Sequence, residues 1–481
     1  MVRYPKIAQL KDSASFIARL RELGIDRLPF DKGVLTAEQG SPLGNPLIIG
    51  QFTVGNRWCI HPMEGWDANG DGSPSPHTLR RWKHFGLSGA KLIWGGEAAA
   101  VQSQGRANPR QTIAGEQNRQ GLQLLLAELL DAHQKHCGDT SDLLVGLQLT
   151  HSGRFSRPNG PKLEPRIAYH HPLLDTKFGI SPDDDSVVFT DDELHRLVDR
   201  YVEAARVAYE IGYQFVDIKA CHGYLLHEFL SAFERKGQFG GDFEGRTRLL
   251  ATILRRVRDE IPDLILGVRL SIFDLVPYQQ GESVGIPVPY DHLLPYRYAF
   301  GTSAKDPRII DLEEPIKLLR LLRDLGVVTV NLSCGSPYYC PHAQRPAIFP
   351  PSDGYMPPED PLLGVWRQIE TARQCKQAVP ELVMVGTGYS YLQDFLPHVA
   401  QAVVREGWID SVGLGRMVLS YPELPLDALR YGKLRRKKVC RTFSDCTTAP
   451  RNGLVSGCYP LDSYYKDLPE YEQLRNAKSD K

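Results

Sequence analysis

The chain has 481 residues and carries 57 Lys and Arg against 57 Asp and Glu, so its formal net charge is zero. This balance gives no reason to expect a nucleic-acid partner or an anionic membrane surface. No apolar run reaches the roughly 18 residues that a membrane helix needs, and charged residues interrupt the N-terminus where a signal peptide would be apolar. Nine cysteines, an odd number, predict free thiols and a cytoplasmic location rather than a disulfide framework.

Short apolar runs alternate with amphipathic helical patterns along the chain. The eight runs cover residues 58–61, 92–94, 145–149, 215–219, 266–271, 327–333, 382–385 and 411–414. Helical patterns between them cover residues 117–136, 190–211, 244–261, 315–325 and 361–378. This alternation predicts an α/β fold with a parallel sheet, and eight repeats favour a closed (β/α)8 TIM barrel over an open doubly wound sheet. We divide the chain into a barrel, residues 1–430, and a Cys-containing tail, residues 431–481, packed on it.

Polar residues stand where these runs end, and the carboxyl ends of the strands carry the chemistry of such barrels. The last two runs close with Gly386-Thr387-Gly388 and Gly413-Leu414-Gly415-Arg416. Glycines let backbone N–H groups approach an anion, and Arg416 adds a bidentate donor. Each glycine pair alone also fits a plain turn, but together the two segments predict a phosphate-bearing cofactor. The sequence contains no G-x-G-x-x-G segment, so we expect no separate Rossmann domain.

The same endings belong to a longer pattern that resembles the old yellow enzyme family of flavin oxidoreductases. Its segments are Asn56-Arg57 with Pro62-Met63, then residues 93–101, 146–154, 217–231, 267–271 and 413–416. The segment Asp217-Ile218-Lys219-Ala220-Cys221-His222-Gly223-Tyr224 is the most specific. The segments follow in order from about residue 45 to residue 430. The span and order of these segments argue strongly against a chance origin.

The resemblance implies a barrel with noncovalent FMN at its mouth and NAD(P)H as the reductant. The cofactor-binding residues it implies are Pro62, Met63, Glu64, Ala98, Gln148, Arg269, Gly388, Gly415 and Arg416. In the family an activated alkene then enters the same pocket. Two side chains from the fourth barrel strand hold its carbonyl oxygen, and a Tyr gives a proton to its α-carbon. The corresponding catalytic residues are Lys219, His222 and Tyr224.

Two positions depart from the family pattern. Lys219 stands where a His is usual, and strand alternation places it with Asp217 on the inner face. Its full charge favours an anionic acceptor; the alternative is a buried salt bridge to Asp217 or Glu97. Glu64 stands where Thr or Cys is usual; it either lowers the flavin potential from beside the ring or is an ordinary loop acid.

The tail carries Cys440, Cys446 and Cys458. Longer relatives, such as 2,4-dienoyl-CoA reductase and trimethylamine dehydrogenase, hold a [4Fe–4S] cluster with four cysteines there. Phe443 occupies one ligand position here, and four thiolates are the normal set, so we expect no cluster. We also expect the insertion at residues 276–311 to shape substrate access.

The resemblance implies an FMN-dependent oxidoreductase in which NAD(P)H-reduced flavin passes hydride to an activated alkene or a related acceptor, and Lys219 favours an anionic one. Two alternatives stay open: a flavin amine dehydrogenase or demethylase, and a non-catalytic flavin electron-transfer subunit. We expect a small-molecule substrate and no nucleic-acid or membrane partner, while a homo-oligomer and the choice between NADH and NADPH stay open.

Overall fold

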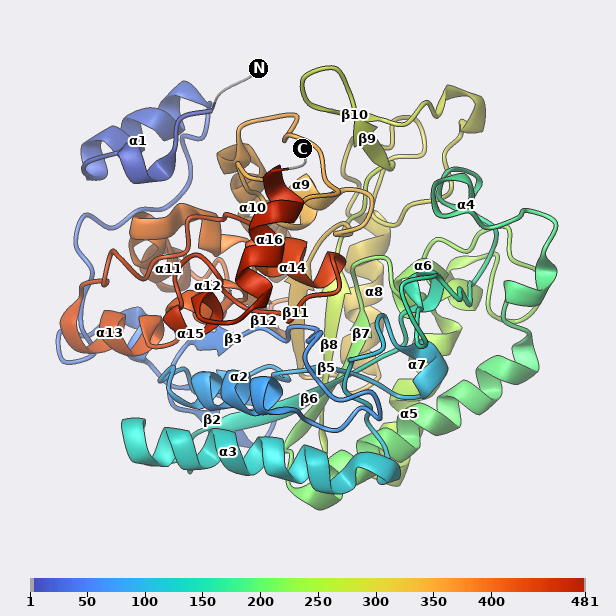
Figure 1. The fold of residues 1–481 in the computed structure, drawn as a ribbon, viewed down its shortest axis with the longest axis horizontal. Coiled ribbons are helices and arrows are strands. Elements are labelled where there is room, and N and C mark those ends of the chain that lie inside the picture. Colours follow the sequence, from blue (N-terminus) through green and yellow to red (C-terminus); the bar gives the residue numbers. More distant parts are fainter. Residues whose placement is uncertain (1–3, 480–481) are drawn as a thin grey trace.

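Eight parallel strands close into a barrel in the computed structural model, which describes residues 4–479 (Figure 1). The strands are β3 (Trp58–Ile60), β4 (Leu92–Ile93), β6 (Leu144–Thr150), β7 (Phe215–Ala220), β8 (Ile265–Ser271), β11 (Thr329–Ser333), β12 (Val383–Gly386) and β13 (Ser411–Leu414). Strand β4 pairs with β3 on one side and with β6 on the other, which closes the sheet. Each predicted run falls on one of these strands, and the predicted TIM barrel is confirmed.

A helix follows each strand and packs on the outside of the barrel. These helices are α2 (Pro76–Gly86), α3 (Arg119–Cys137), α5 (Asp191–Ile211), α7 (Phe243–Glu260), α8 (Glu313–Asp324), α10 (Pro361–Ala378), α11 (Leu396–Arg405) and α13 (Leu424–Tyr431). Helix α5 begins at a capping box, in which the Thr190 side chain accepts from the Glu193 backbone N–H, and it ends at Gly212 with φ of 112°. No described helix is both long and apolar enough to cross a membrane.

Strand alternation decides which side chains of β7 face the barrel interior. Val216 and Ile218 are fully buried in the main hydrophobic core, which also holds apolar side chains of the outer helices. Asp217 and Lys219 have the opposite parity and point inward. Asp217 is fully buried below the mouth, and Lys219 lines a cavity at the mouth.

A small hairpin closes the amino-terminal end of the barrel. Its strands, β1 (Leu47–Ile49) and β2 (Phe52–Val54), pair antiparallel. Ile49 and Val54 are fully buried in a cluster with Trp94 and Phe215 of the barrel. The eight-run pattern did not predict this hairpin, nor the short strand β5 (Ala98–Ala100) that pairs with β6.

Further elements gather at the carboxyl ends of the strands. They are α4 (Pro172–Phe178), α6 (Leu225–Phe229), α9 (Pro341–Gln344), α12 (Met417–Ser420), α14 (Asp445–Arg451), α15 (Ser463–Lys466) and α16 (Glu470–Ser479), with the hairpin β9 (Tyr278–Gln280) and β10 (Gly285–Pro287). Helix α1 (Ser13–Glu22) precedes the barrel. In Figure 1 the C-terminal helices, drawn in red, lie beside these strand ends. Tail residues therefore complete the mouth of the barrel.

Candidate functional site

A cavity of about 620 Å³ lies at the carboxyl ends of the barrel strands. Its size is that of a site for a cofactor or a drug-sized ligand. Most of the site residues suggested by the sequence line it: Pro62, Met63, Glu64, Gln148, Lys219, His222, Tyr224, Arg269, Gly415 and Arg416. The fold thus brings together residues from five strand ends that are up to 354 positions apart.

Two suggested cofactor residues, Ala98 and Gly388, do not line this cavity. Ala98 pairs with Gln148 across the sheet, and its carbonyl accepts from Gln111 Nε2 at 2.7 Å. A side chain at Gly388 would meet Gln368, with Oε1 at 2.6 Å. Any contribution of Gly388 to a phosphate site is limited to its backbone, and both assignments stay predictions.

The inner end of the cavity is a polar group of three side chains. The Asp217 carboxylate accepts from Gln148 Nε2 and from the Arg269 backbone N–H. Burial raises the pKa of Asp217 to about 6. Arg269 Nη1 donates to the Pro62 carbonyl at 3.2 Å, while its buried Nε has no partner within the described chain. A buried cation with a free donor suits the electron-rich pyrimidine edge of a flavin.

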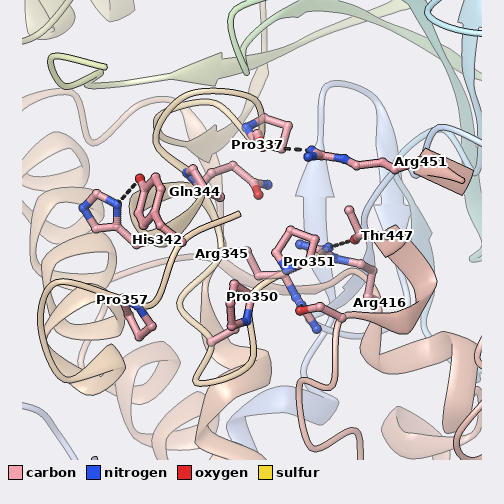
Figure 2. Close-up of a pocket in the computed structure, with 14 residues that line it drawn as sticks. Pro337, His342, Gln344, Arg345, Pro350, Pro351, Pro357, Arg416, Thr447 and Arg451 are labelled. Atoms are coloured by element: carbon pink, nitrogen blue, oxygen red, sulfur yellow. Dashed lines mark hydrogen bonds between the residues drawn. The ribbon is translucent and has the colours of Figure 1, made fainter. Parts of the chain in front are cut away.

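Arg416 lines the other end of the cavity, and Arg345 lies beside it in an adjoining small pocket that Arg416 also lines. Arg416 Nη1 donates to Thr447 Oγ1, and Arg345 Nη1 donates to Ser444 Oγ at 3.1 Å. Burial and the neighbouring charge of Arg345 lower the pKa of Arg416 to about 9. Figure 2 shows the two side chains meeting between the loop of Pro350 and the helix that carries Thr447. No ion pair joins either arginine to any carboxylate of residues 4–479, so an anion would relieve their repulsion.

The space beside Gly415 is open, since a Cβ added there would meet no atom within 4 Å. An exposed backbone and two uncompensated guanidinium groups suit a phosphate. The residues present therefore fit FMN: Arg416 would hold its phosphate, and Pro62, Met63 and Arg269 would hold its ring.

Lys219 forms neither of the salt bridges considered from the sequence. The Asp217 carboxylate accepts hydrogen bonds from Gln148 and from the Arg269 backbone, and Glu97 pairs with Arg81 at 2.6 Å. The Lys219 ammonium instead lies 3.6 Å from the ring centroid of Tyr224. Burial lowers the pKa of Lys219 from its usual value, although a nearby Glu64 acts in the opposite direction. Its charge faces the cavity and is compensated by a π face rather than by a contacting carboxylate.

His222 sits on a turn with φ of 65°, a backbone conformation that few residues other than glycine adopt. Its Nε2 lies 2.7 Å from Ser333 Oγ, and its backbone N–H donates to Ser271 Oγ at 3.0 Å. Burial, followed by the charges of Arg269 and Lys219, holds the pKa of His222 well below its usual range. The imidazole is therefore neutral near pH 7, with an orientation fixed by Ser333.

Tyr224 donates its hydroxyl to the Glu64 carboxylate. The same hydroxyl lies 3.1 Å from the hydroxyl of Tyr338, which comes from the loop after β11. Burial, followed by the charge of Glu64, holds the pKa of Tyr224 well above its usual range. Glu64 is therefore neither an isolated loop acid nor free of partners; it is bound to the residue suggested as the proton donor.

A buried ion-pair network fixes the loop that carries Glu64. Arg81 pairs with Asp67 at 2.8 Å and with Glu97 at 2.6 Å, and all three side chains are at most 3% exposed. Glu97 also accepts from the Gly65 backbone N–H at 2.8 Å. Removing one member would leave a buried charge unpaired, so this network holds the loop rigidly.

Several lining residues were not suggested as site residues by the sequence: His61, Trp66, Arg157, Lys177, Phe178, Tyr338, Cys446, Thr447 and Arg451. His61 bonds Asn331 at 2.9 Å and Thr387 at 3.0 Å, so the segment expected to close on phosphate is partly engaged with His61. Tyr338 comes from the loop after β11 and Arg451 from the last position of α14, and only their place in the fold identifies them. The 276–311 insertion does not line the cavity, but its Tyr278 carbonyl accepts from Lys177, a lining residue, at 3.3 Å.

Burial, followed by the neighbouring Cys440 and Cys446, raises the pKa of Cys458. Phe443 packs against the ring of Phe349 with centroids 5.8 Å apart. Within residues 4–479, no three His, Cys, Asp or Glu side chains are arranged to hold a metal ion. The expectation of no iron–sulfur cluster stays a prediction.

Comparison with known proteins agrees with this geometry. Residues 42–284 match the model of the NADH:flavin oxidoreductase / NADH oxidase family. A putative 12-oxophytodienoate reductase 2 of Oryza sativa subsp. japonica is 29% identical over 250 residues, which are 50% of this chain and 61% of that protein. An NADPH dehydrogenase of Geobacillus sp. is 30% identical over 259 residues, 52% of this chain and 68% of that protein.

The match thus spans less than two thirds of the rice relative. Among solved structures, the old yellow enzyme homologue from Zymomonas mobilis superposes with a TM-score of 0.56 and 22% identity, covering 83% of this chain and 96% of that one. This likeness shows the shared barrel fold. Together with the family match over half of the sequence, it establishes that the chain belongs to the NADH:flavin oxidoreductase / NADH oxidase family.

Proposed function

We propose that this chain is an FMN-dependent reductase of activated alkenes that carry a negative charge, with NAD(P)H as the reductant. One observation carries the proposal: Lys219, His222 and Tyr224 converge on one cavity with the residues that fit FMN. When bound, FMN supplies hydride exchange between a nicotinamide and a second substrate. The chain supplies binding, polarisation and a proton.

The charges that line the cavity favour an anionic substrate. Five lining cations have no ion-pair partner within residues 4–479: Arg157, Lys177, Lys219, Arg269 and Arg416. The phosphate of bound FMN would pair with Arg416, and its ring would lie against Arg269. The remaining charges of the lining would be the cations Arg157, Lys177 and Lys219 and the acid Glu64. This excess of positive charge attracts a carboxylate and repels a protonated amine, which disfavours the amine dehydrogenase alternative.

Three side chains act on the acceptor in this account. Lys219 and His222 bind its carbonyl or carboxylate oxygen, and the ammonium withdraws electron density from it. Tyr224 then donates a proton to the α-carbon. The neutral state of His222 makes it a hydrogen-bond partner of fixed orientation rather than a second cation.

Anaerobic stopped-flow mixing tests the proposal in two arms. In the first, dithionite-reduced protein is mixed with an unsaturated carboxylate that bears a conjugated carbonyl, and flavin absorbance should return rapidly. In the second, oxidised protein is mixed with primary, secondary and tertiary amines, and the absorbance should stay unchanged. Bleaching by an amine without reoxidation by any alkene would favour the alternative function.

We also propose a cytoplasmic location. All nine cysteines are unpaired, and most are buried. Such thiols are typical of proteins kept in a reducing compartment. Oxidative cross-linking of the protein isolated from its native cell under thiol-trapping conditions would contradict this location.

A further inference from the structure

Arg157 lines the cavity, yet the alkene reduction proposed above gives it no specific role. It follows the 3₁₀ helix η5 (Gly153–Phe155) in the loop after β6. Its backbone N–H donates to the Arg106 carbonyl at 2.9 Å, and Nη2 of the buried Arg106 donates to the Pro158 carbonyl at 3.1 Å. The following proline also restricts the backbone of Arg157. The side chain therefore extends from a fixed point on the cavity wall.

The Arg157 guanidinium has no hydrogen-bonding or ionic partner of its own. Its Cζ lies 5.8 Å from the centroid of the Trp66 ring, and contact with a π face occupies none of its N–H donors. The Nε atom is buried without a hydrogen-bond partner, and no carboxylate of residues 4–479 forms an ion pair with Arg157. By contrast, Arg451 in the same lining pairs with Asp353. The planar Arg157 group is thus free to bind a carboxylate or a phosphate through two parallel hydrogen bonds.

A row of contacts along the cavity has a cation at each end and a carboxylate in the middle. Glu64 accepts from the Tyr224 hydroxyl and from Trp66 Nε1, the latter at 3.1 Å. The Lys219 ammonium lies 3.6 Å from the Tyr224 ring centroid, and Arg157 lies over the Trp66 ring. A negatively charged group of a ligand is attracted to either end of this row and is repelled by Glu64 between them.

The charge of the lining exceeds what one carboxylate can balance. Beside bound FMN, the cations without a carboxylate partner would be Arg157, Lys177 and Lys219, against the single acid Glu64. One carboxylate bound at Lys219 would leave two cations and one acid, and Arg157 would keep its free donors. A second anionic group at Arg157 would remove the remaining excess of positive charge.

We infer that Arg157 binds a second anionic group of the acceptor, at the end of the molecule remote from its alkene. The inference rests on the proposed alkene reduction and narrows its substrate class. The acceptor is a dianion whose two anionic groups are separated by an uncharged segment. Lys219 and His222 hold one end, Arg157 holds the other end, and the uncharged segment passes Glu64.

Aromatic side chains of the lining suit this uncharged segment. Tyr338 and Phe178 both line the cavity and both pack on Phe155, with ring centroids 4.0 Å and 5.2 Å from that ring. The Tyr338 hydroxyl lies 3.1 Å from the hydroxyl of Tyr224. These rings are fixed against one another and offer apolar surface to a ligand.

Equilibrium binding to the oxidised holoenzyme tests the inference without turnover, through the change in flavin absorbance. The ligands are saturated keto acids that carry a second, distal carboxylate on spacers of increasing length, each compared with its distal methyl ester. At the best spacer length the parent should bind the diacid roughly 10- to 100-fold more tightly than the half-ester. Arg157→Gln should abolish this preference by weakening the diacid alone.

Matched variants separate Arg157 from the general charge of the cavity. Arg157→Lys keeps the charge but loses the planar pair of donors, so it should keep part of the preference. Lys219→Met should weaken diacid and half-ester alike, and the exposed Arg255→Gln on α7 should match the parent. Equal weakening of diacid and half-ester in Arg157→Gln would overturn the inference.

The phosphates of the reductant are the other anionic groups that enter the cavity. Reduction of oxidised Arg157→Gln by NADH and by NADPH is therefore measured in parallel, and dissociation constants and rates near those of the parent are expected. A loss confined to this half-reaction would assign Arg157 to the reductant and overturn the acceptor site.

The inference and the proposed function fail in different ways. A parent protein that reduces no alkene, yet prefers the diacid through Arg157, would refute the proposed function while keeping the second anion site. A parent protein that reduces an unsaturated keto acid with one carboxylate, but prefers no diacid at any spacer length, would keep the proposed function and overturn the site.

Discussion

Lys219 illustrates how a single residue can add an unpaired charge to a cavity. Its ammonium is buried, faces the cavity and rests on the Tyr224 ring, without an ion pair to any carboxylate of residues 4–479. Strand alternation predicted the inward direction, because residue parity in β7 is fixed. The absence of an ion pair between Lys219 and Asp217 was not predictable. It arises because the Asp217 carboxylate accepts hydrogen bonds from Gln148 and the Arg269 backbone instead.

Lys219→Met should keep FMN bound but weaken a carboxylate acceptor more than its methyl ester. A hydrogen bond to a charged group contributes about 1.5–3 kcal/mol, which is roughly 10- to 100-fold in the dissociation constant of the acid. Titration of the oxidised protein with the acid and the ester measures the difference, with the exposed Lys83→Met as the control. Equal weakening of acid and ester would show that Lys219 does not select for charge.

Arg416→Ala should weaken FMN binding by roughly 10- to 100-fold, because a charge-assisted contact to phosphate is lost. Fluorescence titration of apoprotein with FMN measures the effect, and titration with riboflavin, which has no phosphate, serves as the comparison. Parent and variant should bind riboflavin equally, and the exposed Arg430→Ala should bind FMN like the parent. An FMN affinity unchanged by Arg416→Ala would remove the phosphate from this end of the cavity.

At the scale of elements, the repeat of strand and helix was predictable, and elements outside this repeat were not. The run 411–414 coincides with β13 and is followed by a helix, whereas β1 and β2 pair in an antiparallel hairpin with no helix between them. Strand β5 consists of three alanines, which do not favour a strand by propensity. The contact between Glu64 and Tyr224 joins two loops, and no periodicity along the sequence predicts how two loops meet.

The packing of α2 on α3 offers a test at this scale. Gly86 in α2 lies so close to α3 that an added Cβ would be 2.3 Å from the Leu129 carbonyl oxygen. Gly86→Ala should therefore push the helices apart and lower the stability by about 1–3 kcal/mol. The urea midpoint measures this, and Gly33→Ala, where an added Cβ meets no atom within 4 Å, should match the parent. Equal midpoints for all three proteins would contradict the close helix contact.

For the whole molecule, burial of neutral imidazoles predicts how stability depends on pH. Burial lowers the pKa of nine histidines: His61, His84, His133, His151, His171, His222, His227, His342 and His398. Because the unfolded chain binds these protons at a higher pH than the folded one, stability should fall as pH drops below about 6.5. Each such proton contributes up to about 1.4 kcal/mol per pH unit.

Buried carboxyls act in the opposite direction but are fewer. Burial raises the pKa of Glu97, Asp217 and Glu228, so each favours the folded state slightly as pH falls. The net expectation is a melting temperature that declines steadily from pH 7 to pH 5 in calorimetry. A melting temperature that is flat or rises over this range would contradict the neutral, buried state of the histidines.

The central claim is that this family member passes hydride to the β-carbon of an activated alkene and a solvent proton, through Tyr224, to the α-carbon. The most direct test uses nicotinamide cofactor deuterated at the transferred position, an anionic enone and ordinary water, with the product analysed by NMR. The account predicts one deuterium at the β-carbon and none at the α-carbon. Consumption of the cofactor without deuterium in the product, or deuterium at the α-carbon, would contradict it.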